Sequence, residues 1–363
     1  MGLACQKAAN SPPPKGDPGP ARAGARASAP ADGAAGGPTA SPGAPRGEAA
    51  VGPAAAPETP RGVAPSARSP QDPQGEFDVH QSMDLAPRFP VVPGRTWQEV
   101  SYLGAAGDRI PALFRPARRP GRRPAVILGH GHGGDAGDMA GFFGPSLGRG
   151  VHVLAVNHPF HGRGRRKRGE DICPPDAERL VERWILAVRD LRHALRVLAA
   201  RPDVDQARIG YLGFSLGGCL GALFAAHEPR LRAAALVAPA ADWKLLAASD
   251  SAWHLGFGGQ PLGAWLGVPR LASRLAVIDP ARSIARFAPR PLLVVVGEND
   301  RVIRASSGKA LHLAAGAGKE LLLHPGGHGP GEALRTRVGR WLEGKLGAQA
   351  LSPSEAPPRR QVN

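Results

Sequence analysis

Three polar residues, each placed just beyond a predicted strand, could together carry out nucleophilic catalysis. Ser215 lies in the motif Gly-Phe-Ser-Leu-Gly-Gly at 213–218, Asp300 follows an apolar run, and His328 lies in a glycine-rich loop. A serine hydroxyl becomes a strong nucleophile when a histidine accepts its proton, and a carboxylate behind that histidine fixes its tautomer. The chain order Ser, Asp, His therefore predicts a triad of Ser215, His328 and Asp300.

The motif around Ser215 has a steric logic. A strand that turns abruptly into a helix holds the residue at the bend in a strained conformation, with its side chain directed outward. Gly213 and Gly217, two residues before and after the serine, are needed because a Cβ there would strike the adjacent strand or helix. The helix that follows also directs unpaired N–H groups toward developing negative charge. Asp242, which follows the preceding strand, is the competing candidate for the acid.

Two further segments carry reactive side chains. The glycine-rich turn 130–134 should leave backbone N–H groups available to an oxyanion. The histidines of this turn and of the next strand's loop, His130, His132, His158 and His161, could instead bind zinc, and a metal-dependent hydrolase is the alternative from another class. The arginine-rich segment 162–169 is either a solvated loop or a cationic rim that favours acidic substrates.

Short apolar runs alternate with longer amphipathic stretches, which is typical of a mostly parallel sheet covered by helices. The predicted strands are 97–102, 109–115, 125–128, 151–156, 208–213, 231–237, 291–296 and 320–323. The predicted helices are 175–200, 217–227 and 332–346. The stretch 242–288 has no strand pattern and should form helices that cap the sheet. Cys219, on the apolar face of the second helix, should be a buried free thiol.

Composition divides the chain of 363 residues into three parts. Residues 1–75 are rich in Ala, Pro, Gly and Ser and should form a disordered tether, because they cannot bury enough apolar surface to offset the entropy of ordering. Residues 76–346 should form one domain, and 347–363 a disordered tail. The formal charge of +16 would suit nucleic acid. However, arginine is abundant together with Ala, Gly and Pro, which all have GC-rich codons, so we expect no nucleic-acid partner.

These motifs make the chain from about residue 97 to 346 resemble the α/β-hydrolase superfamily, especially its dienelactone-hydrolase and acetyl-xylan-esterase-like branches. The resemblance implies an eight-stranded, mostly parallel sheet with helices on both faces and a small helical cap. It also implies an oxyanion hole made by the backbone N–H groups of His132 and Leu216. Asn157 departs from the family's loop pattern, in which Asp is usual, and should affect loop packing rather than chemistry.

Together these features predict a serine hydrolase that cleaves a small-molecule carboxylic ester through an acyl-enzyme on Ser215. No cofactor is expected. A serine peptidase of the same fold is the alternative, and neither the acyl group, the alcohol nor the oligomeric state follows from the sequence. As written, the chain should be cytoplasmic. Leu3, Ala4 and Cys5 resemble the end of a bacterial lipoprotein signal, so a start upstream would give a lipid-anchored protein of the cell envelope.

Overall fold

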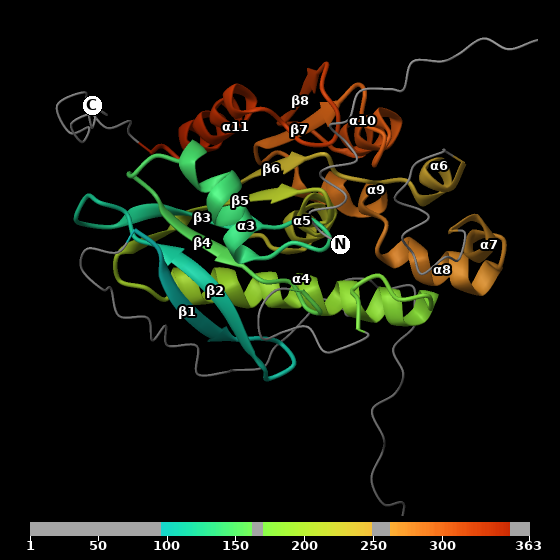
Figure 1. Cartoon of the computed structure of the whole chain (residues 1–363), viewed down its shortest axis with the longest axis horizontal. Coiled ribbons are helices and arrows are strands. Elements are labelled where there is room, and N and C mark those ends of the chain that lie inside the picture. Colours follow the sequence, from blue (N-terminus) through green and yellow to red (C-terminus); the bar gives the residue numbers. More distant parts are fainter. Residues whose placement is uncertain (1–95, 162–169, 249–261, 349–363) are drawn as a thin grey trace, which may run out of the picture. The chain divides into compact units, whose positions relative to one another are not determined.

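The computed structural model describes residues 96–161, 170–248 and 262–348. An eight-stranded sheet in the order β1-β2-β4-β3-β5-β6-β7-β8 is its central layer (Figure 1). The strands are β1 Gln98–Leu103, β2 Arg109–Arg115, β3 Arg123–Gly129, β4 His152–Val156, β5 Val204–Phe214, β6 Ala233–Val237, β7 Leu292–Gly297 and β8 Lys319–His324. Two pairings are antiparallel, β1 with β2 and β2 with β4, whereas β4, β3, β5, β6, β7 and β8 are mutually parallel. The carboxyl ends of six strands therefore meet at one edge of the sheet.

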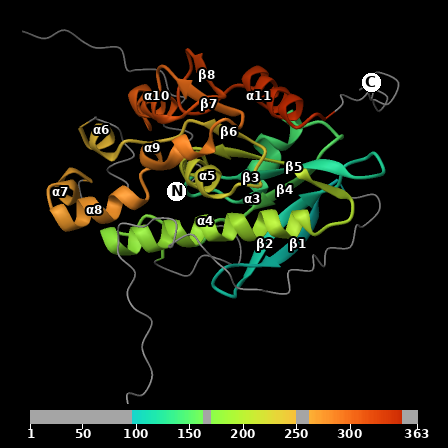
Figure 2. The same cartoon turned by 180° about the vertical axis from the view of Figure 1, so that it is seen from behind.

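Helices cover both faces of the sheet, as predicted. The helices are α3 Ala136–Phe142, α4 Ala177–Ala199, α5 Leu216–His227, α6 Trp243–Ala248, α7 Leu262–Leu266, α8 Pro269–Val277, α9 Pro280–Ser283, α10 Ala305–Ala314 and α11 Glu332–Lys345, with 3₁₀ turns η1 Gly144–Ser146 and η3 Ile284–Phe287. One apolar cluster joins the sheet to α3 and α11, and a second joins the opposite face to α4, α5 and α10. The view from behind shows α4 running along the sheet beside α5 (Figure 2).

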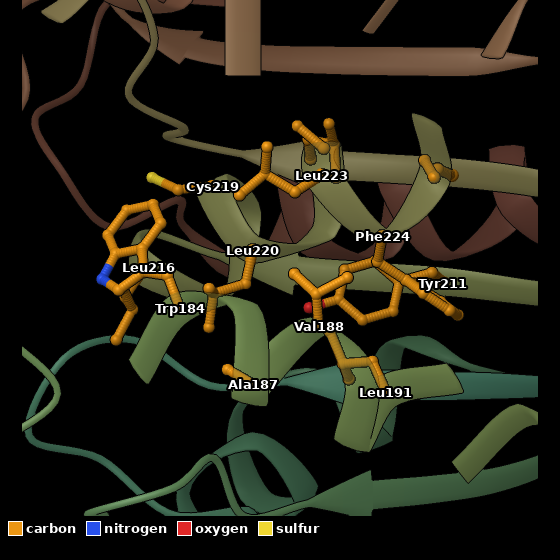
Figure 3. Close-up of a cluster of buried hydrophobic side chains, with 14 of the residues drawn as sticks. Trp184, Ala187, Val188, Leu191, Tyr211, Leu216, Cys219, Leu220, Leu223 and Phe224 are labelled. Atoms are coloured by element: carbon orange, nitrogen blue, oxygen red, sulfur yellow. The ribbon is translucent and has the colours of Figure 1, made fainter. Parts of the chain in front are cut away.

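The contact between α4 and α5 places the helix that begins just after Ser215. Trp184, Val188 and Leu191 of α4 face Leu220 and Phe224 of α5 in one buried cluster (Figure 3). Complete burial of an aliphatic or aromatic side chain of this size contributes about 1.5–3 kcal/mol. The cluster thus holds α5 firmly against the sheet, and with it the residue at its amino end.

The structure confirms the predicted fold class and differs from the sequence interpretation in detail. The predicted strands agree with β1 to β8 to within a few residues, and the stretch 242–288 holds α6 to α9 and η3. Two helices, α3 and α10, were not predicted. Among the described residues, none of the helices has the length and apolar character needed to cross a bilayer. The tether 1–75, the start of the domain at residue 76, the Leu-Ala-Cys signal, the arginine-rich segment 162–169 and almost all of the tail 347–363 lie outside the described residues.

Candidate active site

Ser215 lies at the sharp bend between β5 and α5. Its backbone has φ 54° and ψ −118°, a conformation that a residue with a side chain rarely adopts. A Cβ on Gly213 would lie 2.2 Å from the carbonyl oxygen of Gly217, and a Cβ on Gly217 would lie 2.2 Å from that of Gly129. The steric reason predicted for the two glycines is confirmed, since any larger residue at either position would force helix and strands apart.

The structure brings the three predicted side chains together. His328 Nε2 lies 2.9 Å from Ser215 Oγ, and His328 Nδ1 lies 2.7 Å from Asp300 Oδ2. Ser215 and Asp300 are buried, and the imidazole is 14% exposed. The ring of Phe214 packs against it, with centroids 5.1 Å apart. With Nδ1–H donating to the carboxylate, Nε2 carries the lone pair that accepts the hydroxyl hydrogen of Ser215.

The segments that carry Asp300 and His328 are bonded to each other. The N–H of Glu298 donates to the carbonyl of His324 at 2.8 Å. Asn299 donates from its backbone N–H to the carbonyl of Gly326 at 3.2 Å and from its side-chain amide to that of Pro325 at 2.7 Å. The loop after β8 therefore cannot move independently of the turn after β7, and this fixes the imidazole relative to its carboxylate.

Asp242, the competing acid, has a different role. Its Oδ1 accepts the N–H of Leu245 at 3.0 Å and so caps the start of α6. Its own N–H donates to Asp279 at 2.9 Å. Asp300, and not Asp242, is the carboxylate in contact with His328.

The segments that carry the two predicted oxyanion donors border Ser215. A Cβ on Gly131 would lie 3.4 Å from Ser215 Cβ, so the turn 130–134, which includes His132, runs directly beside this residue. Leu216 is the first residue of α5, and its N–H therefore has no carbonyl partner one turn earlier within the helix. Asn157 is buried, and its Oδ1 accepts the N–H of Ala136 at the start of α3 at 2.7 Å. This contact agrees with the packing role expected for Asn157.

The four histidines proposed as a zinc cluster do not form one set. Both ring nitrogens of His130 contact the backbone: Nδ1 lies 2.8 Å from the carbonyl of Gly131, and Nε2 accepts the N–H of His158 at 3.0 Å. His132 instead approaches His161 and Asp171, a residue that the sequence interpretation did not include. Candidate ligand atoms of His132, His161 and Asp171 all lie within 4.8 Å of one another.

Cys219 is a buried free thiol, as predicted, and it lies one helical turn after Ser215. Its Sγ donates to the carbonyl of Ser215 at 3.3 Å and accepts the N–H of Ala240 at 3.1 Å. Burial raises the pKa of the Cys219 thiol to about 12, so it stays protonated at neutral pH. The thiol is thus a packing group. It links the bend at Ser215 between β5 and α5, here called the elbow, to the segment after β6.

A doubly wound sheet with a strained serine at a strand–helix bend, followed by Asp and His beyond later strands, defines the α/β-hydrolase class. The family model for the alpha/beta hydrolase fold matches residues 124–264. An uncharacterized protein of Mycobacterium tuberculosis is 30% identical over 235 residues, which are 64% of this chain and 72% of its own. The chain belongs to the α/β-hydrolase superfamily.

Two further comparisons agree. A putative hydrolase of Bacillus subtilis, YtaP, is 29% identical over 214 residues, which are 54% of this chain and 68% of its own. The crystal structure of acetyl xylan esterase 1 from a Thermoanaerobacterium species superposes with a TM-score of 0.58 at 21% identity, and the match covers 71% of this chain and 86% of the other. These matches support the coarser prediction that the chain is a hydrolase.

Proposed function

We propose that this chain is a serine hydrolase that cleaves a carboxylic ester through an acyl-enzyme on Ser215. The observation that carries the proposal is the pair of contacts made by one imidazole, 2.9 Å to Ser215 Oγ and 2.7 Å to Asp300 Oδ2. This arrangement lets His328 take the hydroxyl proton as Ser215 Oγ attacks an acyl carbonyl, while Asp300 stabilises the imidazolium that forms.

The tetrahedral intermediate then places negative charge on the former carbonyl oxygen. We assign the backbone N–H groups of His132 and Leu216 as its hydrogen-bond donors. The closeness of the turn 130–134 to Ser215 and the place of Leu216 at the amino end of α5 support this assignment. A donor of this kind stabilises the transition state by about 3 kcal/mol. The imidazolium of His328 protonates the leaving alcohol, and water releases the acyl group in a second, equivalent attack.

The ester as substrate class is taken from the structural neighbour named as an acetyl xylan esterase. Aromatic surface lies beside the imidazole, because Phe214 packs on His328 and its ring lies 5.8 Å from that of Phe142. A peptide bond is the competing substrate.

The experiment combines turnover with covalent labelling. The purified chain is assayed with nitrophenyl esters of increasing acyl length and with aminoacyl nitroanilides, and it is then treated with a fluorophosphonate and mapped by mass spectrometry. We expect ester turnover and a label on Ser215. Ser215→Ala should lose both, whereas Ser306→Ala, at an exposed serine of α10, should keep both. Full turnover by Ser215→Ala would contradict the assignment of Ser215 as the nucleophile. Faster cleavage of the nitroanilides than of the esters would make a peptide, and not an ester, the substrate class.

A further inference from the structure

Beside the serine site, two histidines and one carboxylate from three separate segments meet. His132 Nε2 lies 2.8 Å from Asp171 Oδ1, and the rings of His132 and His161 lie 5.1 Å apart, edge to face. His132 and Asp171 are each 36% exposed, whereas His161 is buried. The proposed hydrolase mechanism uses the backbone of His132 but none of these three side chains.

His161 has the orientation of a metal ligand. Its Nδ1 lies 3.2 Å from the carbonyl of Pro159, and because a carbonyl only accepts, Nδ1 carries the hydrogen. Nε2 therefore carries the lone pair. Metal-binding histidines commonly donate their other ring N–H to a backbone carbonyl in this way, which fixes the tautomer and the ring orientation.

Asp171 is held in place by contacts that a bound cation would not disturb. Its Oδ1 accepts the N–H of Cys173 at 2.8 Å, and its backbone carbonyl accepts the guanidinium of Arg183. That guanidinium also lies 4.2 Å from the ring centroid of Phe160, so Arg183 joins the segment of Asp171 to that of His161.

We propose that His132, His161 and Asp171 form a binding site for a divalent transition-metal ion of the zinc type. Two imidazoles and one carboxylate are a donor set that suits zinc, with water in the remaining position. Bonds of about 2.0–2.2 Å at tetrahedral angles put neighbouring ligand atoms about 3.4 Å apart. Ligand atoms that already lie within 4.8 Å of one another reach this spacing by side-chain shifts of about 1 Å.

The proposal changes the metal hypothesis made from the sequence. Two of the four histidines remain, and Asp171 takes the place of the other two. The ion takes the place of the hydrogen that His132 Nε2 shares with Asp171, and a neutral imidazole keeps that hydrogen on Nδ1, so the ion leaves the turn 130–134 tethered to Asp171. The site does not depend on the serine mechanism, and Ser215→Ala should bind metal like the unmodified chain.

The test uses the full chain after treatment with a chelator. Zinc chloride is titrated by calorimetry, and cobalt(II) binding is followed by visible absorption. We expect one ion per chain, a raised Tm, and the intense bands of four- or five-coordinate cobalt. His132→Gln and Asp171→Asn should each weaken binding about 100-fold, and they should fold because both side chains are partly exposed. His312→Gln, at a histidine of α10 outside the cluster, is the matched control.

Three results would overturn the proposal. One is the absence of binding at micromolar zinc. Another is equal affinity of His132→Gln, Asp171→Asn and the unmodified chain. The third, which needs no variant, is the weak spectrum of six-coordinate cobalt in the unmodified protein. Metal binding by a chain that hydrolyses neither the esters nor the nitroanilides would reject the serine hydrolase and keep the metal site, so the two proposals can fail separately.

Discussion

The carboxylate of Asp300 uses its two oxygens differently. Oδ2 lies 2.7 Å from Nδ1 of His328, whereas Oδ1 accepts the N–H groups of Val302 at 2.8 Å and Ile303 at 2.9 Å. The two backbone donors set the rotation of the carboxyl group. Only one oxygen is thereby presented to the imidazole, and the side chain has no freedom to exchange the two.

Because the two oxygens of Asp300 have different partners, Asp300→Asn is an informative variant. The amide oxygen should keep the two backbone N–H groups, which leaves the NH₂ group facing Nδ1 of His328. An N–H donor there favours the tautomer with hydrogen on Nε2, and that nitrogen can no longer accept the proton of Ser215. We expect kcat for a nitrophenyl ester to fall by about 10³–10⁴-fold with little change in Tm. Asp242→Asn is the control: it should keep the cap of α6 and most of the activity. A larger loss in Asp242→Asn would reverse the assignment of the acid.

Gly217→Ala tests the contact between the elbow helix and β3. The new Cβ would lie 2.2 Å from the carbonyl oxygen of Gly129, where backbone and not a flexible side chain must move. We expect the free energy of unfolding to fall by about 1–3 kcal/mol or more, and esterase activity to be lost. In Gly141→Ala the Cβ meets nothing within 4 Å, and this exposed position of α3 should gain about 0.5–1 kcal/mol. Urea unfolding of both variants measures the difference, and equal stabilities would contradict the steric argument.

Asn299 should act as a positioning residue for His328. Asn299→Ala removes the 2.7 Å hydrogen bond to the carbonyl of Pro325 and loosens the loop that carries the imidazole. We expect kcat to fall about tenfold, because a less well-positioned base acts in the chemical step, and KM to change little. Glu298→Gln, at the exposed neighbour, should leave both constants unchanged. A rise in KM alone would assign Asn299 to substrate binding instead.

His227 should make stability depend on pH. The pKa of His227 is lowered to about 4: burial is the main cause, Arg286, whose guanidinium donates to His227 Nε2, adds to it, and the hydrogen bond to the carbonyl of Leu223 opposes both. The unfolded chain binds this proton near pH 6.5, well before the folded chain does. The contribution of His227 is therefore complete above pH 6.5 and is lost as pH falls toward 4, by up to about 3 kcal/mol.

The measurement is urea unfolding at pH 7 and pH 4.5. His227→Gln cannot take up the proton, so its free energy of unfolding should decline less between these pH values than that of the unmodified chain. An identical decline would show that His227 is not responsible.

The sequence allowed prediction of the sheet and of the site residues at its edge, because both depend on local pattern. Apolar runs mark strands, and polar residues directly after parallel strands must lie at the same edge. Two helices were missed because their local pattern is weak. Helix α3 has only seven residues and includes two glycines, and α10 combines small residues with Gly308. Asp135 and Asp138, which cap the start of α3 reciprocally, were the signal that could have revealed it.

The contact between His132 and Asp171 could not be predicted in this way. The two residues are 39 positions apart, and Asp171 belongs to no motif or periodic element. Its position results from tertiary packing, in particular from Arg183 of α4, which reaches its backbone carbonyl. Nor could the sequence show which of the four histidines lie together. Only the folded backbone shows that both ring nitrogens of His130 contact the main chain.

The close approach of Gly217 to Gly129 has a consequence for protein engineering. Helix α5 rests at Gly217 on the backbone of a central strand without any side chain between them, so no choice of amino acid can adjust that spacing. Attempts to change substrate range should leave the elbow untouched and randomise the helices α6 to α8, which follow the carboxyl end of β6; α6 packs on α10, α8 packs on α4, and α7 packs on both α6 and α8. Libraries restricted to those helices should retain folded members far more often than libraries that include the elbow.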